Sequence, residues 1–196
     1  MSDPAEAAMT SPSTDDDPLV LAMPRRELFR FSGFTTAIDL ALIESLSNES
    51  WYTVASTLVS NFDAKEVRLG LLFERGDFVL LDAGGALLHT TSVGPEVGKL
   101  GSGIKALRDL ALLAGARFVG VERVRCELTG FLNEDGIPGY KEAMILVYRC
   151  RVSEDAQSPP GMNWVGRAQL ASLPVDPVSV LIAEKLYLAP PPPPPV

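Results

Sequence analysis

The alternation of apolar and polar positions predicts three main helices between residues 25 and 188. Residues 36–46 place apolar side chains at helical spacing, with Thr36 and Asp39 as candidate capping residues. Residues 104–114 show the same spacing before Gly115, a residue type that commonly follows the last turn of a helix. Residues 178–188 predict an amphipathic helix near the end of the chain.

Runs of β-branched, aromatic and apolar residues predict the strands. Two of these runs, 66–73 and 78–81, flank the polar sequence Glu-Arg-Gly-Asp, and together they predict a β-hairpin. A polar loop is expected at 133–139. The predicted strands occupy residues 51–57, 66–73, 78–81, 117–128, 143–152 and 163–165.

The two ends of the chain differ in composition from the body. Residues 1–24 hold five acidic side chains and no Lys or Arg, which predicts a disordered acidic tail. Residues 189–196 include six consecutive prolines, which favour an extended polyproline II tail. Between them we expect an N-terminal helix-and-strand extension over residues 25–65 and one domain over residues 66–188.

Composition and charge narrow the functional classes. With 46% hydrophobic residues, the 196-residue chain can build a sizeable core. The net charge of −8 argues against nucleic acid as a partner, because proteins that bind phosphate backbones usually carry a basic face. No targeting signal or membrane span is expected, so a cytoplasmic location is the prediction, with an organellar matrix left open.

Gly94, Arg-Asp-Leu at 108–110 and Gly115 hold a fixed spacing that ends directly after the predicted helix 104–114. Together with the order of the predicted elements, this spacing resembles the box of the Nudix superfamily, G-x5-E-x7-R-E-U-x-E-E-x-G-U, where U is aliphatic. Trp164 and a Leu-Pro element after it are similar to a late region of the family. The resemblance covers residues 66–187 and implies an α/β fold, a mixed sheet flanked by helices.

The departures from the box bear on catalysis. Leu100, Leu112 and Leu113 stand where the family has glutamates that hold Mg²⁺, and only Asp109 keeps a carboxylate. Because Mg²⁺ needs oxygen ligands, one carboxylate would hold the ion poorly. The resemblance therefore implies a degenerate box, with no catalytic residues and no cofactor expected.

Two functions follow from the resemblance. The first is a non-catalytic module that binds a protein partner, a second copy of the chain or a nucleotide-type small molecule; Gly94, Arg108 and Asp109 would contact the ligand, and Leu112 and Leu113 would form an interface. The alternative is a divergent hydrolase of nucleoside diphosphate-linked substrates. That hydrolase would use weakly held Mg²⁺ and the carboxylates Asp109, Glu142 and Glu127.

A minor alternative rests on glycines. The sequence Gly-Ser-Gly-Ile-Lys-Ala at 101–106 fits a relaxed dinucleotide-binding fingerprint, and Glu122 lies near the position of a ribose-binding acid. That motif normally follows an apolar strand directly, whereas residues 94–99 are mostly polar or glycine. An oxidoreductase is therefore kept only as a third class.

The remaining reactive side chains favour structural roles. Cys126 and Cys150 fall in predicted strands, where cysteine usually serves as a small buried hydrophobe. A reactive thiol needs electropositive neighbours, and the candidates are Arg125, Arg149 and Arg151. The single histidine, His89, is expected to be exposed or satisfied by hydrogen bonds.

Overall fold

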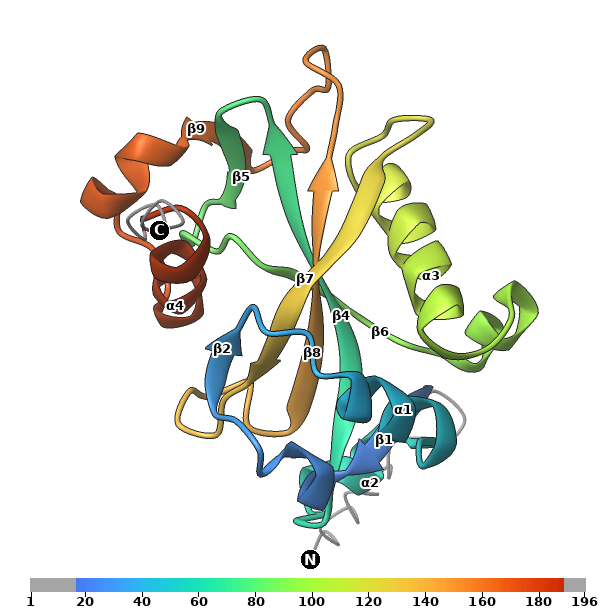
Figure 1. Cartoon of the computed structure of the whole chain (residues 1–196). Helices are drawn as coiled ribbons and strands as arrows, with labels where there is room; N and C mark the ends of the chain where they lie inside the picture. Colours follow the sequence, from blue (N-terminus) through green and yellow to red (C-terminus); the bar gives the residue numbers. More distant parts are fainter. Residues whose placement is uncertain (1–16, 189–196) are drawn as a thin grey trace, which may run out of the picture.

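The computed structural model describes residues 17–188, which form a nine-stranded mixed sheet with helices on both faces (Figure 1). The strands are β1 (Leu19–Pro24), β2 (Gly33–Thr35), β3 (Trp51–Val54), β4 (Ala64–Arg75), β5 (Phe78–Asp82), β6 (His89–Ser92), β7 (Arg125–Asn133), β8 (Ala143–Arg151) and β9 (Met162–Gly166). The helices are α1 (Leu40–Asn48), α2 (Ala55–Val59), α3 (Gly103–Phe118) and α4 (Pro177–Leu186), with 3-10 turns η2 (Arg25–Leu28), η3 (Pro95–Leu100) and η4 (Arg167–Ser172).

Strand β4 organises the sheet. One edge of β4 pairs in parallel with β8 along residues 66–74. The other edge pairs antiparallel with β1, β6 and β5 in turn, at residues 64–66, 68–71 and 74–75. Beyond β8 the sheet continues to β7 and β2, and β9 pairs with β5. The prediction of a mixed α/β fold is confirmed.

Strict alternation along the central strands builds two cores. Successive side chains of a strand point to opposite faces, so Val67, Leu69 and Leu71 of β4 join the core under α3, whereas Leu72 joins the core under α4. Strand β8 follows the same rule, with Tyr148 under α3 and Val147 under α4. Figure 1 shows α3 and α4 on opposite sides of the sheet.

The predicted end of the acidic tail at residue 24 is wrong. Residues 19–24 form β1, which pairs with both β3 and β4, and Val20 to Met23 are buried. Burial of these apolar side chains and pairing with two neighbouring strands stabilise β1, although acidic residues precede it in the sequence. The N-terminal segment is thus part of the sheet. The rest of the acidic tail, residues 1–16, and the proline tail, residues 189–196, lie outside the described residues.

The first helix begins later than predicted. Asp39 is extended and its carboxylate accepts hydrogen bonds from the backbone N–H groups of Ala41 and Leu42, which makes Asp39 the N-cap of α1. The helix therefore begins at Leu40. The predicted strand 51–57 is also shorter, because the chain turns into α2 at Ala55.

The prediction that Gly115 ends the box helix is wrong. Helix α3 continues to Phe118, and Gly115 is buried inside it against β7 and β8. The helix ends before Gly120, which has a positive φ of 65°. The next strand consequently begins at Arg125, eight residues after the predicted start. The predicted hairpin is confirmed as β4 and β5, and the predicted strands near the end of the chain correspond to β8 and β9.

Among the helices of residues 17–188, none combines the length and apolarity needed to cross a bilayer.

Candidate ligand-binding groove

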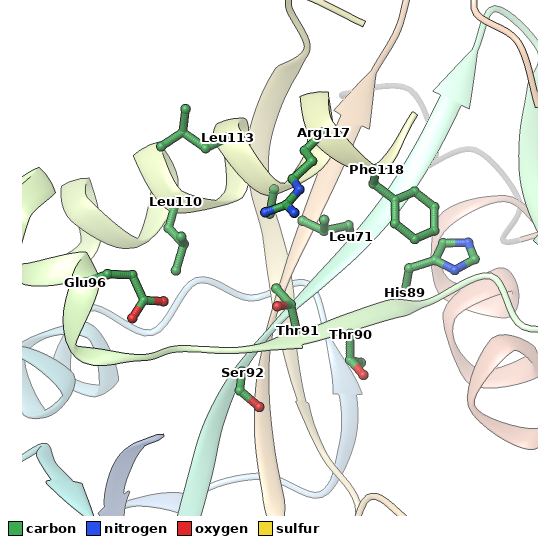
Figure 2. Close-up of a pocket in the computed structure, with 11 residues that line it drawn as sticks. Leu71, His89, Thr90, Thr91, Ser92, Glu96, Leu110, Leu113, Arg117 and Phe118 are labelled. Carbon is green, nitrogen blue, oxygen red and sulfur yellow. The ribbon is translucent and has the colours of Figure 1, made fainter. Parts of the chain in front are cut away.

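A groove of about 620 Å³ lies between α3 and β6 (Figure 2). Strand β6 is held against β4, and the C-terminal half of α3 passes over the same face of the sheet. Leu71 of β4, the strand that pairs with β6, also lines the groove. The lining residues are Leu71, His89, Thr90, Thr91, Ser92, Glu96, Leu110, Leu113, Ala114, Arg117 and Phe118.

The lining combines an apolar helix face with an aromatic end and two charged side chains. Leu110 and Leu113 of α3 form the apolar part. The ring centroids of Phe118 and His89 lie 4.9 Å apart, and the two ring planes are inclined at 37°. Arg117 reaches toward β6 from the helix, and Glu96 lies at the other end of the groove (Figure 2). Apolar walls with a few polar groups are typical of small-molecule sites.

His89 is neutral near pH 7 in this environment. Burial lowers its pKa below the ordinary 6.5, which outweighs the opposing effects of Asp82 and of a hydrogen bond to the Leu80 backbone. Its ring packs against those of Phe73 and Phe118, with centroid distances of 5.8 Å and 4.9 Å, and the two phenylalanine rings stack on each other at 5.0 Å. The Nε2 atom is buried and has no hydrogen-bond partner among residues 17–188, so the expectation of a satisfied or exposed histidine is wrong for this atom.

Helix α3 places Asp109, Leu112 and Leu113 together, because residues three and four apart are neighbours on a helix surface. Leu113 is 58% exposed and lines the groove, so it does not pack into the core. Leu112 is half-buried and packs against the core under α3. The Asp109 carboxylate is 3.4 Å from the guanidinium of Arg108, its neighbour in sequence.

The carboxylates considered for the hydrolase alternative are not gathered around Asp109. Cys126 contacts Ala111 of α3, so the next residue of β7, Glu127, points to the opposite face of the sheet, where it pairs with Arg151 at 3.7 Å. Glu142 lies just before β8 and interacts electrostatically with the buried Lys65.

This donor set does not fit Mg²⁺. Within residues 17–188, no three His, Cys, Asp or Glu side chains gather closely enough to hold a metal ion. Mg²⁺ takes oxygen ligands in near-octahedral geometry, and leucine supplies none. At the positions where the resemblance places glutamates, α3 carries an acid only at Asp109, and the side chain of Leu100 lies outside the described part of the chain.

None of the predicted ligand-binding residues lines the groove. Gly94, Arg108 and Asp109 do not line it, although Gly94 lies directly before η3, whose Glu96 does. Arg117 and Phe118 were missed because the box helix was predicted to end at Gly115. The sequence did not predict that the hydroxyl groups of β6 line the groove. The His-Thr-Thr-Ser run is polar, and it forms a strand only through pairing with β4.

The glycines before α3 shape a turn and lack the context of a dinucleotide site. Gly101 and Gly103 have positive φ values of 123° and 62°, and they carry the chain from η3 into α3. A strand would have to precede the first glycine directly in the dinucleotide fold, whereas the 3-10 turn Pro95–Leu100 does so here.

Comparisons with known proteins identify the fold. No protein-family model matches this chain, and no curated protein does. Among solved structures, the chain is similar to Tm1382, described as "a putative Nudix hydrolase", with a TM-score of 0.73, 14% identity, and coverage of 87% of this chain and 98% of that chain. The fold is therefore Nudix-like, as the sequence predicted.

A second structure shows a weaker likeness. It is described as "a putative oxidoreductase (SMa0793) from Sinorhizobium meliloti 1021", with a TM-score of 0.41, 18% identity, and coverage of 69% of this chain and 46% of that chain. A TM-score at this level does not establish a shared fold.

Proposed function

We propose that this chain is a non-hydrolytic Nudix-like module that binds a small nucleotide-type ligand in the groove between α3 and β6. The observation that carries the proposal is the position of Leu113. It replaces a box glutamate, remains 58% exposed, and lines a groove whose far end holds the Phe118 and His89 rings. The site has exchanged carboxylate oxygens for apolar surface.

The lining matches a ligand with a planar or apolar part and an anionic part. Leu110, Leu113 and Phe118 offer surface for a ring system, and Arg117 offers a guanidinium that pairs with phosphate or carboxylate. The volume of about 620 Å³ falls in the usual range for small-molecule sites, roughly 300–1,000 Å³. This concave shape favours a small ligand over the protein partner or second copy that the leucines also suggest.

The donor set of α3 supports the absence of hydrolysis. Attack on a diphosphate requires charge neutralisation and an activated water, which Mg²⁺ supplies when several acids hold it. Asp109 lies beside Arg108, while Glu127 projects from the other face of the sheet. The carboxylates that the divergent hydrolase would need to hold Mg²⁺ therefore do not lie close together.

Binding is tested by calorimetry with AMP, ADP and the uncharged adenosine, with EDTA present. ADP is expected to bind more tightly than adenosine. Arg117→Ala is expected to weaken the affinity for ADP at least tenfold and to leave the affinity for adenosine unchanged. Arg123→Ala is the matched control, since Arg123 is exposed outside the groove. Absence of binding for all three probes, or equal losses in both arginine variants, contradicts the proposal.

Hydrolysis is tested by phosphate and monophosphate release from sugar diphosphates and dinucleoside diphosphates with Mg²⁺ or Mn²⁺. No turnover above buffer is expected. Metal-dependent turnover that disappears in Asp109→Asn would overturn the non-hydrolytic proposal and establish the hydrolase alternative.

A further inference from the structure

Two cysteines from neighbouring strands meet under α3. Cys126 of β7 and Cys150 of β8 are direct partners in the antiparallel ladder, and their Sγ atoms are 2.8 Å apart as free thiols. The Cα atoms of directly opposed antiparallel residues are about 4.5–5.5 Å apart, a spacing that a disulfide spans. The strand register therefore already provides the backbone spacing of a disulfide.

The box glycine makes room for this pair. A Cβ atom at Gly115 would lie 3.5 Å from the Cys150 Sγ, 3.7 Å from the Cys126 Sγ and 3.3 Å from a Val124 methyl group. The Cys126 thiol also lies 3.6 Å from the backbone oxygen of Ala111, one turn earlier in α3. The helix thus passes directly over both sulfur atoms without separating them.

We propose that Cys126 and Cys150 are a reversible redox dithiol that closes to an intrachain disulfide by exchange with a small-molecule disulfide. The Cys126 thiolate attacks one sulfur of the reagent, forms a mixed disulfide and releases the first reagent thiolate. Cys150, as it loses its proton, attacks the Cys126 sulfur and releases the second. Two protein thiols are oxidised, one reagent disulfide is reduced to two thiols, and the two protein protons end on those thiols.

Exposure sets the order of the two steps. Cys126 is half-buried whereas Cys150 is fully buried, so we expect the reagent to reach Cys126 first. A hydrogen bond from the Cys150 thiol lowers the pKa of Cys126, and that same bond together with burial raises the pKa of Cys150. Closure then requires the sulfur atoms to approach by about 0.8 Å, since an S–S bond is about 2.05 Å long.

The arginines adjacent in sequence do not activate the pair. Arg125, Arg149 and Arg151 each precede or follow one of the two cysteines on its strand, so their side chains leave from the opposite face of the sheet. There Arg149 and Arg151 approach Glu74 at 3.1 Å and 3.9 Å. The neighbouring thiol itself is the group that favours the Cys126 thiolate.

The test treats the native full chain with excess oxidised glutathione, quenches it with acid and measures intact mass and free thiols after unfolding. The reduced protein should show two free thiols. The treated protein should be a monomer with none, lighter by two hydrogens, and dithiothreitol should restore both. A peptide map should recover the two cysteines in one cross-linked pair.

Single variants separate the steps. Cys150→Ser should stop at a glutathione adduct on Cys126, and Cys126→Ser should react at least tenfold more slowly than that, because only the buried thiol remains. The proposal is overturned if wild-type protein keeps both thiols, if it accumulates the Cys126 adduct with Cys150 free, or if it forms disulfide-linked dimers instead.

Discussion

The buried ammonium group of Lys65 donates a 2.7 Å hydrogen bond to the side-chain oxygen of Asn133, from β4 to the end of β7. The Asn133 amide in turn donates to the backbone oxygens of Leu28 and Phe31, at 3.0 Å and 2.9 Å. One asparagine thus joins the N-terminal segment, the central strand and β7. Asp135 completes the surroundings of the ammonium group as a second acceptor.

Replacing Asn133 by Ala is expected to lower the free energy of unfolding by about 3 kcal/mol, because a buried cation loses an acceptor and two backbone oxygens lose a donor. Urea denaturation followed by circular dichroism measures the change. Asn48→Ala, at an exposed position at the end of α1, is the control and should shift stability by less than about 0.5 kcal/mol. Equal effects in the two variants would contradict the structural role of Asn133.

The pH dependence of stability should report on His89, the only histidine in the chain. Burial lowers its folded-state pKa below 6.5, so the unfolded chain binds more protons between the folded value and 6.5. Stability should therefore fall as the pH drops from 7 toward 5, with no His89 contribution above about 7.

The measurement compares wild type with His89→Asn by chemical denaturation at several pH values. The variant should lose less stability than wild type between pH 7 and pH 5, whatever its absolute stability. A folded-state pKa at or above 6.5, measured by NMR titration of the imidazole, would be inconsistent with this account.

Leu112 and Leu113, which stand where the resemblance places glutamates, should respond differently to substitution by Glu. Leu113→Glu is expected to change the free energy of unfolding by less than about 0.5 kcal/mol, because Leu113 is 58% exposed. Leu112→Glu should cost at least about 1 kcal/mol, since that side chain packs against the core. Thermal or urea denaturation of the two single variants measures the difference. A larger loss of stability for Leu113→Glu than for Leu112→Glu would mean that the Leu113 face of α3 is covered.

Helix α4 is tied to the central strand by Tyr187, whose hydroxyl donates a 3.0 Å hydrogen bond to the carboxylate of Glu74. Tyr187→Phe should lower stability by about 1.5–3 kcal/mol, the usual range for a hydrogen bond to a charged group. Tyr52→Phe is the matched control, because Tyr52 is 38% exposed. Urea denaturation of both variants should show a loss confined to Tyr187→Phe.

Close approach of the backbone at Gly130 should make that glycine hard to replace. A Cβ atom there would lie 2.1 Å from the backbone oxygen of Thr35, where β2 pairs with β7. Gly130→Ala should therefore cost several kcal/mol or prevent folding, as overpacking against fixed backbone does. Gly98→Ala meets open space and should be tolerated, so similar yields and melting temperatures for the two variants would contradict the pairing of β2 with β7.

Local pattern was enough to predict the elements that carry their own periodicity. Strand β8 begins with an unbroken apolar run over residues 143–148, and the hairpin of β4 and β5 turns at a glycine with positive φ. The spacing around Gly115 predicted the Nudix-like fold. These features depend on neighbours a few residues apart. The sequence alone therefore determined the fold class.

Tertiary contacts decided the elements with weak local patterns and the shape of the groove. Residues 19–24 and the polar residues 89–92 become strands only because β4 offers them an edge. The groove, the contrast between Leu112 and Leu113, and the meeting of Cys126 with Cys150 depend on how α3 lies across the sheet. Such contacts join residues far apart in the chain, and no local periodicity encodes the distance between them.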